Sequence, residues 1–312
     1  MPLFPRGTRI GPWGSYMSKP ATFSTSIDPA LAKKLKADLE DQGFEFTYPL
    51  HSLFSAKKRG VSLTLYKSGA LVVQGKEKEP FIEFYLEPEI LKDFTYTNPL
   101  ANLDLTPRIG MDEAGKGDYY GPLCVTSLYA DSEGINTLVK WGVKDSKTFS
   151  DKKILELGKK IQKEFQASSI KLFPLKYNEL YEKFNNLNRM LAWAHATALG
   201  NLYEKTHCKN AILDKFGPDS LVESALNYKN ISINLVQKTK AESDPVVAAA
   251  SIVARMEFLF GMDSLSKEVG ITLPKGANNG IITTGKQLVS AHGPEILRKA
   301  GKLHFKTTGQ IL

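Results

Sequence analysis

Apolar and polar positions in the first third of the chain follow two different periods. Between positions 28 and 42 apolar residues recur every four residues, which predicts an amphipathic helix. Residues 61–66 then alternate between apolar and polar, a Lys-Ser-Gly turn follows, and 70–74 continues as a second apolar run, so we expect a β-hairpin. A helical pattern returns at 80–91. Together these patterns predict a small α+β domain over residues 25–93.

The pattern changes after a segment at 94–107, which contains Asn-Pro and Thr-Pro and is expected to be a linker. Beyond it, strands alternate with helices, which predicts an α/β domain over 108–312. At the other end of the chain, residues 1–24 are expected to form a disordered leader. Strands are expected at 108–111, 123–129, 169–175, 211–213 and 231–236, and helices at 151–165, 187–206, 245–261 and 294–300.

Composition and charge narrow the class of protein. A chain of 312 residues is expected to form two domains, and 42% hydrophobic with 24% charged residues is ordinary for a soluble globular protein. The 41 Lys and Arg residues outnumber the 33 Asp and Glu residues, which suits a polyanionic partner, although a solvated surface explains so modest an excess as well. Residues 296–312 include several basic residues and no acidic one, so we expect Lys302 and Lys306 to contact phosphate.

Cysteine usage and apolar run lengths bear on the cellular setting. The two cysteines have no second Cys or His at metal-like spacing, which predicts a reducing, cytoplasmic environment. The longest apolar stretches fall far short of the ~20 residues that span a bilayer, and the start of the chain lacks the apolar core of a signal peptide. We therefore expect a cytoplasmic protein with no membrane contact.

The most informative stretch begins at the end of the strand expected at 108–111. There Asp112 and Glu113 lead directly into Gly115-Lys116-Gly117. Open α/β sheets bind ligands at the carboxyl ends of their strands, so the position suits a site. Adjacent residues of a strand point to opposite faces, so the two carboxylates are expected to share a site only if the strand ends there. The alternative is a strand-to-turn junction with solvated acids.

Further carboxylates follow other predicted elements. Asp214 ends the apolar run at 211–213, and Glu242 and Asp244 precede the helix expected at 245–261. Helix capping is the alternative for Asp214 and the leading one for Asp244. Four carboxylates can hold two hard divalent cations, which phosphodiester hydrolysis uses to activate water and to stabilise the leaving oxygen. Lys116 and Lys147 would add positive charge near the phosphate.

Taken in chain order, these motifs resemble those of the type 2 ribonucleases H, and specifically ribonuclease HIII. The resemblance covers 108–309, about two-thirds of the chain. Lys116, where ribonucleases HII usually have Arg, and the following Asp-Tyr-Tyr favour the HIII type. The matching motifs are Asp112-Glu113-Ala114-Gly115-Lys116-Gly117-Asp118-Tyr119-Tyr120-Gly121-Pro122, Asp145-Ser146-Lys147, Tyr177-Asn178, Asn186-Leu187-Asn188, Asp214, Lys240-Ala241-Glu242-Ser243 and 248–255.

The resemblance implies an RNase H-like fold, dependence on Mg²⁺ or Mn²⁺, and cleavage of the RNA strand of RNA/DNA hybrids to leave 5′-phosphate and 3′-hydroxyl ends. It makes Asp112, Glu113 and Asp214 metal ligands. In ribonucleases HII an Asp follows Lys-Ala or Lys-Gly; that place here is Glu242, so Glu242 is the favoured fourth carboxylate and Asp244 the alternative. The expected substrate contacts are Gly115, Lys116, Gly117, Ser146, Lys147, Tyr177, Asn178, Asn186, Lys240, Lys302 and Lys306.

Several roles stay open at this point. Glycines let backbone amides reach the ribose 2′-hydroxyl, which distinguishes RNA from DNA. Asn186 is explained equally well as a cap, and His195 is expected to be a buried packing histidine. The resemblance also implies a TATA-box-binding-protein-like fold for 25–93, with Lys57, Lys58 and Arg59 as hybrid contacts or a solvated loop. We expect the protein to be a monomer. Two alternative functions are ribonuclease HII-like incision at single ribonucleotides in DNA and non-catalytic binding of nucleic acid.

Overall fold

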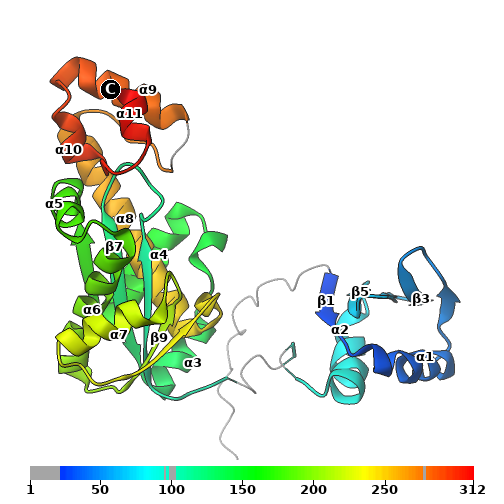
Figure 1. Ribbon diagram of the computed structural model, residues 1–312. Coiled ribbons are helices and arrows are strands. Elements are labelled where there is room, and N and C mark those ends of the chain that lie inside the picture. The colour runs from blue at the N-terminus through cyan, green and yellow to red at the C-terminus, as the bar shows by residue number, and fades with distance from the viewer. Residues whose placement is uncertain (1–21, 95, 98–102, 277–278) are drawn as a thin grey trace, which may run out of the picture. The chain divides into compact units, whose positions relative to one another are not determined.

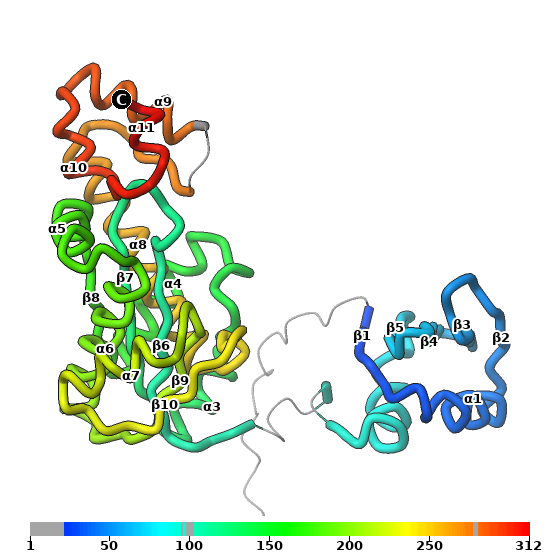
Figure 2. Tube along the Cα trace, in the orientation of Figure 1, coloured from blue at the N-terminus to red at the C-terminus, as the bar shows by residue number. Residues whose placement is uncertain are grey.

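The computed structural model describes residues 22–94, 96–97, 103–276 and 279–312. The chain divides into two compact units, with the boundary between Asp104 and Leu105 (Figures 1 and 2). Most of the expected leader lies outside the described residues. Its last part was assigned wrongly, because residues 22–24 belong to a strand paired with residues 72–74. The sequence of an edge strand gives little local indication of a strand when its partner lies about fifty positions away in the chain.

The N-terminal unit is a five-stranded antiparallel sheet in the order β1-β5-β4-β3-β2. The expected hairpin is confirmed, with Leu63 opposite Val73. The strands at residues 22–26, 45–47 and 52–58 were not expected. Strands are β1 (Thr22–Ser26), β2 (Glu45–Thr47), β3 (Ser52–Lys58), β4 (Val61–Tyr66) and β5 (Ala70–Gln74), and helical segments are η1 (Pro29–Leu31), α1 (Ala32–Asp41), α2 (Lys78–Phe81) and η2 (Ile82–Leu91).

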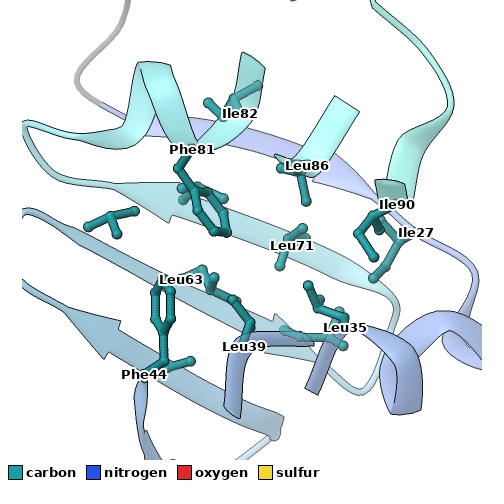
Figure 3. Close-up of a cluster of buried hydrophobic side chains, with 14 of the residues drawn as sticks. Ile27, Leu35, Leu39, Phe44, Leu63, Leu71, Phe81, Ile82, Leu86 and Ile90 are labelled. Carbon is teal, nitrogen blue, oxygen red and sulfur yellow. The ribbon is translucent and has the colours of Figure 1, made fainter. Parts of the chain in front are cut away.

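One face of this sheet carries the core of the unit. Leu35 and Leu39 of α1 and Leu86 of η2 are buried in one cluster with Leu63 and Leu71 of the sheet (Figure 3). The helices at both ends of the unit therefore cover the same face, which agrees with the expected α+β class. The likeness to the TATA-box-binding-protein fold stays a prediction.

The segment expected to link the two units is shorter than 94–107. The buried carboxylate of Glu87 accepts hydrogen bonds from the backbone N–H groups of Tyr96 (2.7 Å) and Thr97 (3.2 Å), so these residues belong to the first unit. At the other end, the Leu105 carbonyl accepts a hydrogen bond from Ser132 Oγ (2.8 Å). The expected linker was therefore too long, because hydrogen bonds with side chains hold its two ends against the two units.

The second unit is built on a mixed five-stranded sheet in the order β10-β9-β6-β7-β8. β9 runs parallel to β6 and β10, while β7 is antiparallel to both of its neighbours. The strands are β6 (Arg108–Ala114), β7 (Leu123–Ala130), β8 (Ala167–Leu172), β9 (Asn210–Asp214) and β10 (Asn234–Lys238). The helical segments are α3 (Ser132–Lys140), η3 (Ser146–Thr148), α4 (Asp151–Glu164), α5 (Pro174–Phe184), α6 (Leu187–Thr206), α7 (Asp219–Tyr228), η4 (Ala241–Ser243), α8 (Pro245–Val269), α9 (Asn279–His292), α10 (Ile296–Ala300) and α11 (Thr307–Ile311).

Helices lie on both faces of this sheet. α8 packs along β6 and β7 (Figure 1). Its close approach requires Gly110, because a Cβ there would lie 2.3 Å from the carbonyl carbon of Val246. On the opposite face α6 packs against Ile109 and Met111. The strict alternation of β6 therefore sends even-numbered residues toward α8 and odd-numbered residues toward α6.

Several expected elements need correction. The helices expected at 151–165 and 187–206 are confirmed, but the strand expected at 169–175 ends at Leu172, because Pro174 begins α5 with its fixed φ. α3, α5, α7, α9 and α11 were not expected.

The helix expected at 245–261 continues to residue 269 as α8. By length and composition it could cross a membrane, so the expectation that apolar stretches fall far short of this was wrong. Of its most apolar window, 78% is buried inside the protein, as in a core helix.

Candidate active site

The sheet divides at the end of the pairing between β6 and β9. These strands pair in parallel only as far as Met111 opposite Leu213. β6 then continues beside β7 to Ala114, while β9 stays with β10 to Asp214. Asp112 and Asp214 are thus the first residues beyond the last β6–β9 pair. A fork at the carboxyl ends of parallel strands is where α/β sheets bind ligands.

Asp112 and Glu113 leave the strand on opposite faces. β6 does not end at Asp112 as expected, and its pairing with β7 runs through Glu113. Asp112 points toward α8, where it hydrogen-bonds Ser251, whereas Glu113 Oε2 lies 3.1 Å from His195 Nε2 on α6. The two carboxylates share a site despite this, because β9 no longer covers the edge between them. Both line a pocket of about 460 Å³ together with Asp214.

The carboxylates at the fork perturb one another. Burial, followed by the charges of Glu113 and Asp214, raises the pKa of Asp112 to about 7. Burial also raises the pKa of Asp214, opposed by a hydrogen bond from the Ala241 N–H (2.9 Å). Burial acts against ionisation of Glu113 too, but His195 and Lys116 outweigh it and lower the pKa of that carboxyl. Burial therefore disfavours the charged form of all three carboxyl groups, and only at Glu113 do neighbouring basic side chains outweigh it.

Positive side chains surround this pocket. Lys116 Nζ lies 3.4 Å from Glu113 Oε1, and Lys147, Arg255 and Lys275 also line the pocket. Asp151 holds Arg255 at 3.1 Å and also pairs with Lys275. Arg255 and Lys275 were not foreseen as site residues. For Arg255 a signal existed: it lies four positions after Ser251 on α8, so both share a helix face.

The carboxylate oxygens of Asp112, Glu113 and Asp214 are negatively charged oxygen donors, which hard divalent cations prefer as ligands. Among the described residues, however, no three carboxylate, imidazole or thiol side chains converge closely enough to hold an ion as they stand. Glu113 is engaged by His195 and Lys116, and one oxygen of Asp214 accepts the Ala241 N–H. Binding an ion would require carboxylates to turn, with Lys116 releasing Glu113.

The structure separates Glu242 from its alternative, Asp244. Asp244 is buried, accepts a hydrogen bond from Arg108 Nε (2.8 Å) and caps α8 through the Val246 N–H (2.9 Å). Its carboxylate is committed to the fold. Glu242 is half-buried in η4, and its charge raises the pKa of Asp214, although it does not line the pocket.

The two glycines of the Gly115-Lys116-Gly117 loop differ. Gly115 has φ +83°, and a Cβ there would lie 2.2 Å from the Pro122 carbonyl oxygen, so the fold itself requires glycine. At Gly117 a Cβ would meet nothing within 4 Å. The packing of the chain therefore does not explain the second glycine.

Three expected substrate contacts are wrong, because their side chains are buried. Lys302 is 0% exposed, and its ammonium donates to the carbonyls of Asp118 (2.7 Å) and Gly121 (2.8 Å). Burial lowers its pKa to about 7. Asn178 donates to the Gly301 carbonyl (2.9 Å) and accepts from the Leu303 N–H (3.0 Å). Tyr177 is equally buried beneath Lys302. All three hold the C-terminal segment and the loop after β6 in place.

The remaining candidates lie in various settings. Ser146 is buried at the pocket wall, with its Oγ 2.7 Å from Ser251 Oγ. Asn186 caps α6 through the Arg189 N–H (3.0 Å), the role that capping predicted. Lys240 and Lys306 are exposed, and their contact with phosphate stays a prediction.

A mixed sheet that divides beside half-buried acids, with basic side chains around the opening, defines a nuclease of the RNase H-like class. A family model described as Ribonuclease HII matches residues 109–308. A second, described as a domain of unknown function (DUF3378), matches residues 23–98.

Relatives and solved structures agree with this class. A ribonuclease HIII of Protochlamydia amoebophila is 48% identical over 296 residues, covering 95% of this chain and 98% of the relative. That of Chlamydia abortus is 46% identical over 298 residues, with 95% and 98% covered. The crystal structure of Bst-RNase HIII in complex with Mn²⁺ is 29% identical, with a TM-score of 0.66 and 93% and 97% covered. The Aquifex aeolicus RNase H3 structure is 27% identical, with a TM-score of 0.55 and 91% and 100% covered. The chain belongs to the type 2 ribonuclease H family and, within it, to the ribonucleases HIII. It is an endonuclease of the ribonuclease H type.

Proposed function

We propose that this chain cleaves the RNA strand of RNA/DNA hybrids with two divalent cations, Mg²⁺ or Mn²⁺, held by Asp112, Glu113, Asp214 and Glu242. The observation that carries the proposal is the crowding of carboxylates at the fork, where burial and neighbouring charges raise the pKa of Asp112 to about 7. Such crowding costs stability unless cations offset it. The Mn²⁺ in the Bst-RNase HIII structure supports a divalent cation.

When bound, the cations supply activation of the attacking water and offset the charge that develops on the scissile phosphate and the leaving oxygen. The basic residues of the chain itself would bind the phosphates of the substrate. Lys116, Lys147, Arg255 and Lys275 border the pocket and attract its phosphates, and Asp151 holds the last two in fixed positions.

Recognition of ribose is assigned to the loop after β6. Gly117 is exposed and no neighbour occupies the space of its missing side chain, so a substrate can approach the backbone there. The 2′-hydroxyl is the group that separates RNA from DNA at such a contact. Lys302 keeps this loop in place through its carbonyl contacts.

The N-terminal unit binds the hybrid through the sheet face that the helices leave open. Lys57 is exposed and follows the alternation of Ser55, which faces away from the core, whereas Lys58 donates to the Gln42 carbonyl (2.7 Å). Lys57 is therefore a stronger candidate than Lys58. The protein acts as a monomer in the cytoplasm, a setting with which its two free cysteines are consistent.

The experiment is cleavage of an end-labelled RNA/DNA hybrid in Mg²⁺, Mn²⁺ or EDTA, beside a DNA duplex that contains one ribonucleotide. Wild type and Asp112→Asn are compared. We expect metal-dependent internal cutting of the hybrid, absent in Asp112→Asn and weak at the single ribonucleotide. Preferred cutting at the single ribonucleotide would assign ribonuclease HII-like specificity, and no cutting of either substrate would overturn the proposal.

A matched pair of variants tests the fourth carboxylate. Glu242→Gln is expected to lose most cleavage while its thermal unfolding in EDTA stays close to that of wild type. Asp244→Asn is expected to lower stability, because Arg108 loses a buried charged partner. The reverse pattern, with activity lost only in a stable Asp244→Asn, would assign the role to Asp244.

A further inference from the structure

Within the part of the chain that the structure describes, His195 makes one polar contact, and that contact is with a proposed metal ligand. The side chain is 0% exposed on α6, beneath the odd-numbered face of β6. Its Nε2 lies 3.1 Å from Glu113 Oε2, whereas its Nδ1 has no hydrogen-bond partner among the described residues. Phe216 stacks on the ring with centroids 5.2 Å apart and an interplanar angle of 13°.

Packing alone does not account for an imidazole at this position. A buried nitrogen without a partner costs about 1–3 kcal/mol, which an apolar side chain of similar size would avoid. An ionised carboxylate only accepts hydrogen bonds, so Nε2 carries the proton and donates it to Glu113. Phe216 fixes the plane of the ring in which this donor lies.

The two oxygens of Glu113 are held differently. Oε2 faces the buried ring of His195, while Oε1 lies 3.4 Å from the ammonium of Lys116, whose side chain is 34% exposed. The first contact is short and enclosed. The second is long and reaches the pocket, so Lys116 can leave without opening the core.

We infer that His195 is a positioning residue that fixes Oε2 of Glu113 and thereby presents Oε1 to the divalent cation of the proposed function. This inference rests on that function. Groups that hydrogen-bond a metal-ligating carboxylate restrict its orientation, and their loss typically costs about 10–100-fold in metal affinity.

The test is a calorimetric titration of the full chain with Mn²⁺ in the absence of substrate, which measures the affinity for Mn²⁺. His195→Leu is expected to weaken Mn²⁺ binding about 10–100-fold. His195→Gln, whose amide N–H can replace Nε2, is expected to stay within about 3-fold of wild type on the same scale. Thr197→Val is the control on the same helix, because its hydroxyl donates to the Trp193 carbonyl (2.7 Å) and does not contact Glu113, and it is expected to bind Mn²⁺ like wild type.

The outcomes separate failure of the proposed role of His195 from failure of the proposed metal site. Equal weakening by His195→Gln and His195→Leu, or no weakening by either, would overturn the role of His195 while leaving the metal site in place. Absence of Mn²⁺ binding by wild type would overturn the proposed function itself. In a Glu113→Gln background His195→Leu should have no further effect on Mn²⁺ affinity; an undiminished effect would show that His195 acts by another route. Should His195→Leu fail to unfold cooperatively in EDTA, His195→Asn, too short to reach Oε2, takes its place.

Discussion

Replacing Asp112 by Asn should make the metal-free protein more stable at alkaline pH while abolishing activity. The buried carboxyl of Asp112 sits beside Glu113 and Asp214, and its pKa is raised from the ordinary value of 3.8 to about 7. A raised pKa means that the folded state binds the proton more tightly than the unfolded state. The stability contributed by this proton is fully present below 3.8 and is lost as the pH rises through about 7.

The size of the effect follows from the same two values. The difference between 3.8 and about 7 corresponds to about 4 kcal/mol at pH 8, which is an upper limit because Asp112 and Glu113 titrate together. Asn keeps an acceptor for the Glu113 N–H and can donate to Ser251, so little hydrogen bonding is lost. We expect a gain of about 1–3 kcal/mol, or roughly 3–8 °C in Tm for a unit of this size.

The assay is thermal unfolding of wild type and Asp112→Asn in EDTA from pH 5 to pH 8, repeated with Mn²⁺. The advantage of the variant should grow as the pH rises from 5 to about 7 and level off above it, because the folded and unfolded states differ in bound protons only between 3.8 and about 7. Mn²⁺ should stabilise wild type and have much less effect on the variant. A variant that is less stable at pH 8, or whose advantage does not change with pH, would refute the electrostatic reasoning.

Three other predictions concern the scaffold of the site. Arg108→Met should lower stability by about 3–5 kcal/mol in urea unfolding, because it leaves the buried carboxylate of Asp244 without its cation; a loss below about 1 kcal/mol would contradict this. Gly115→Ala should cost about 2 kcal/mol or more because φ is +83°, whereas Gly117→Ala should melt like wild type but cleave the hybrid more slowly; equal stability losses would be the contrary result. Burial lowers the pKa of Lys302 from 10.5 to about 7, so the unfolding free energy is highest above 10.5 and falls as the pH drops toward about 7. Lys302→Met should remove this dependence of the unfolding free energy on pH between pH 7 and 10. An unchanged slope would count against this reasoning.

Local sequence was enough to place the central acids. Asp112 and Glu113 follow a short apolar run, and Asp214 follows another, so their position at strand ends could be read directly. What could not be read is why they form one site. That depends on the register of two strands a hundred positions apart, whose pairing stops at Met111 and Leu213. A shared site was expected only if β6 ended at Asp112, yet the strand continues to Ala114.

Two basic residues differ from expectation in different ways: Lys302 is buried, and His195, which is buried as expected, also contacts a carboxylate. Lys302, in a basic C-terminal segment, was expected to contact phosphate, and His195, within an apolar helix, to pack. In the structure Lys302 is enclosed and bonds loop carbonyls, while His195 reaches a carboxylate at the fork. Charge and neighbours in sequence describe a surface only if the residue is exposed, and exposure is decided by the whole fold.

The sequence by itself determined the two-unit organisation, the α/β class of the second unit, the helices α4 and α6, most of α8, and the acids near the carboxyl ends of β6 and β9. These follow from periodicity and short motifs, which act over a few residues. Only the tertiary structure decided that the carboxylate of Asp244 is committed to the fold. Asp244 is held by Arg108, 136 positions earlier in the chain, whereas Glu242 lies near enough for its charge to raise the pKa of Asp214. No local pattern encodes such a partner, because it exists only once β6 and α8 have packed together.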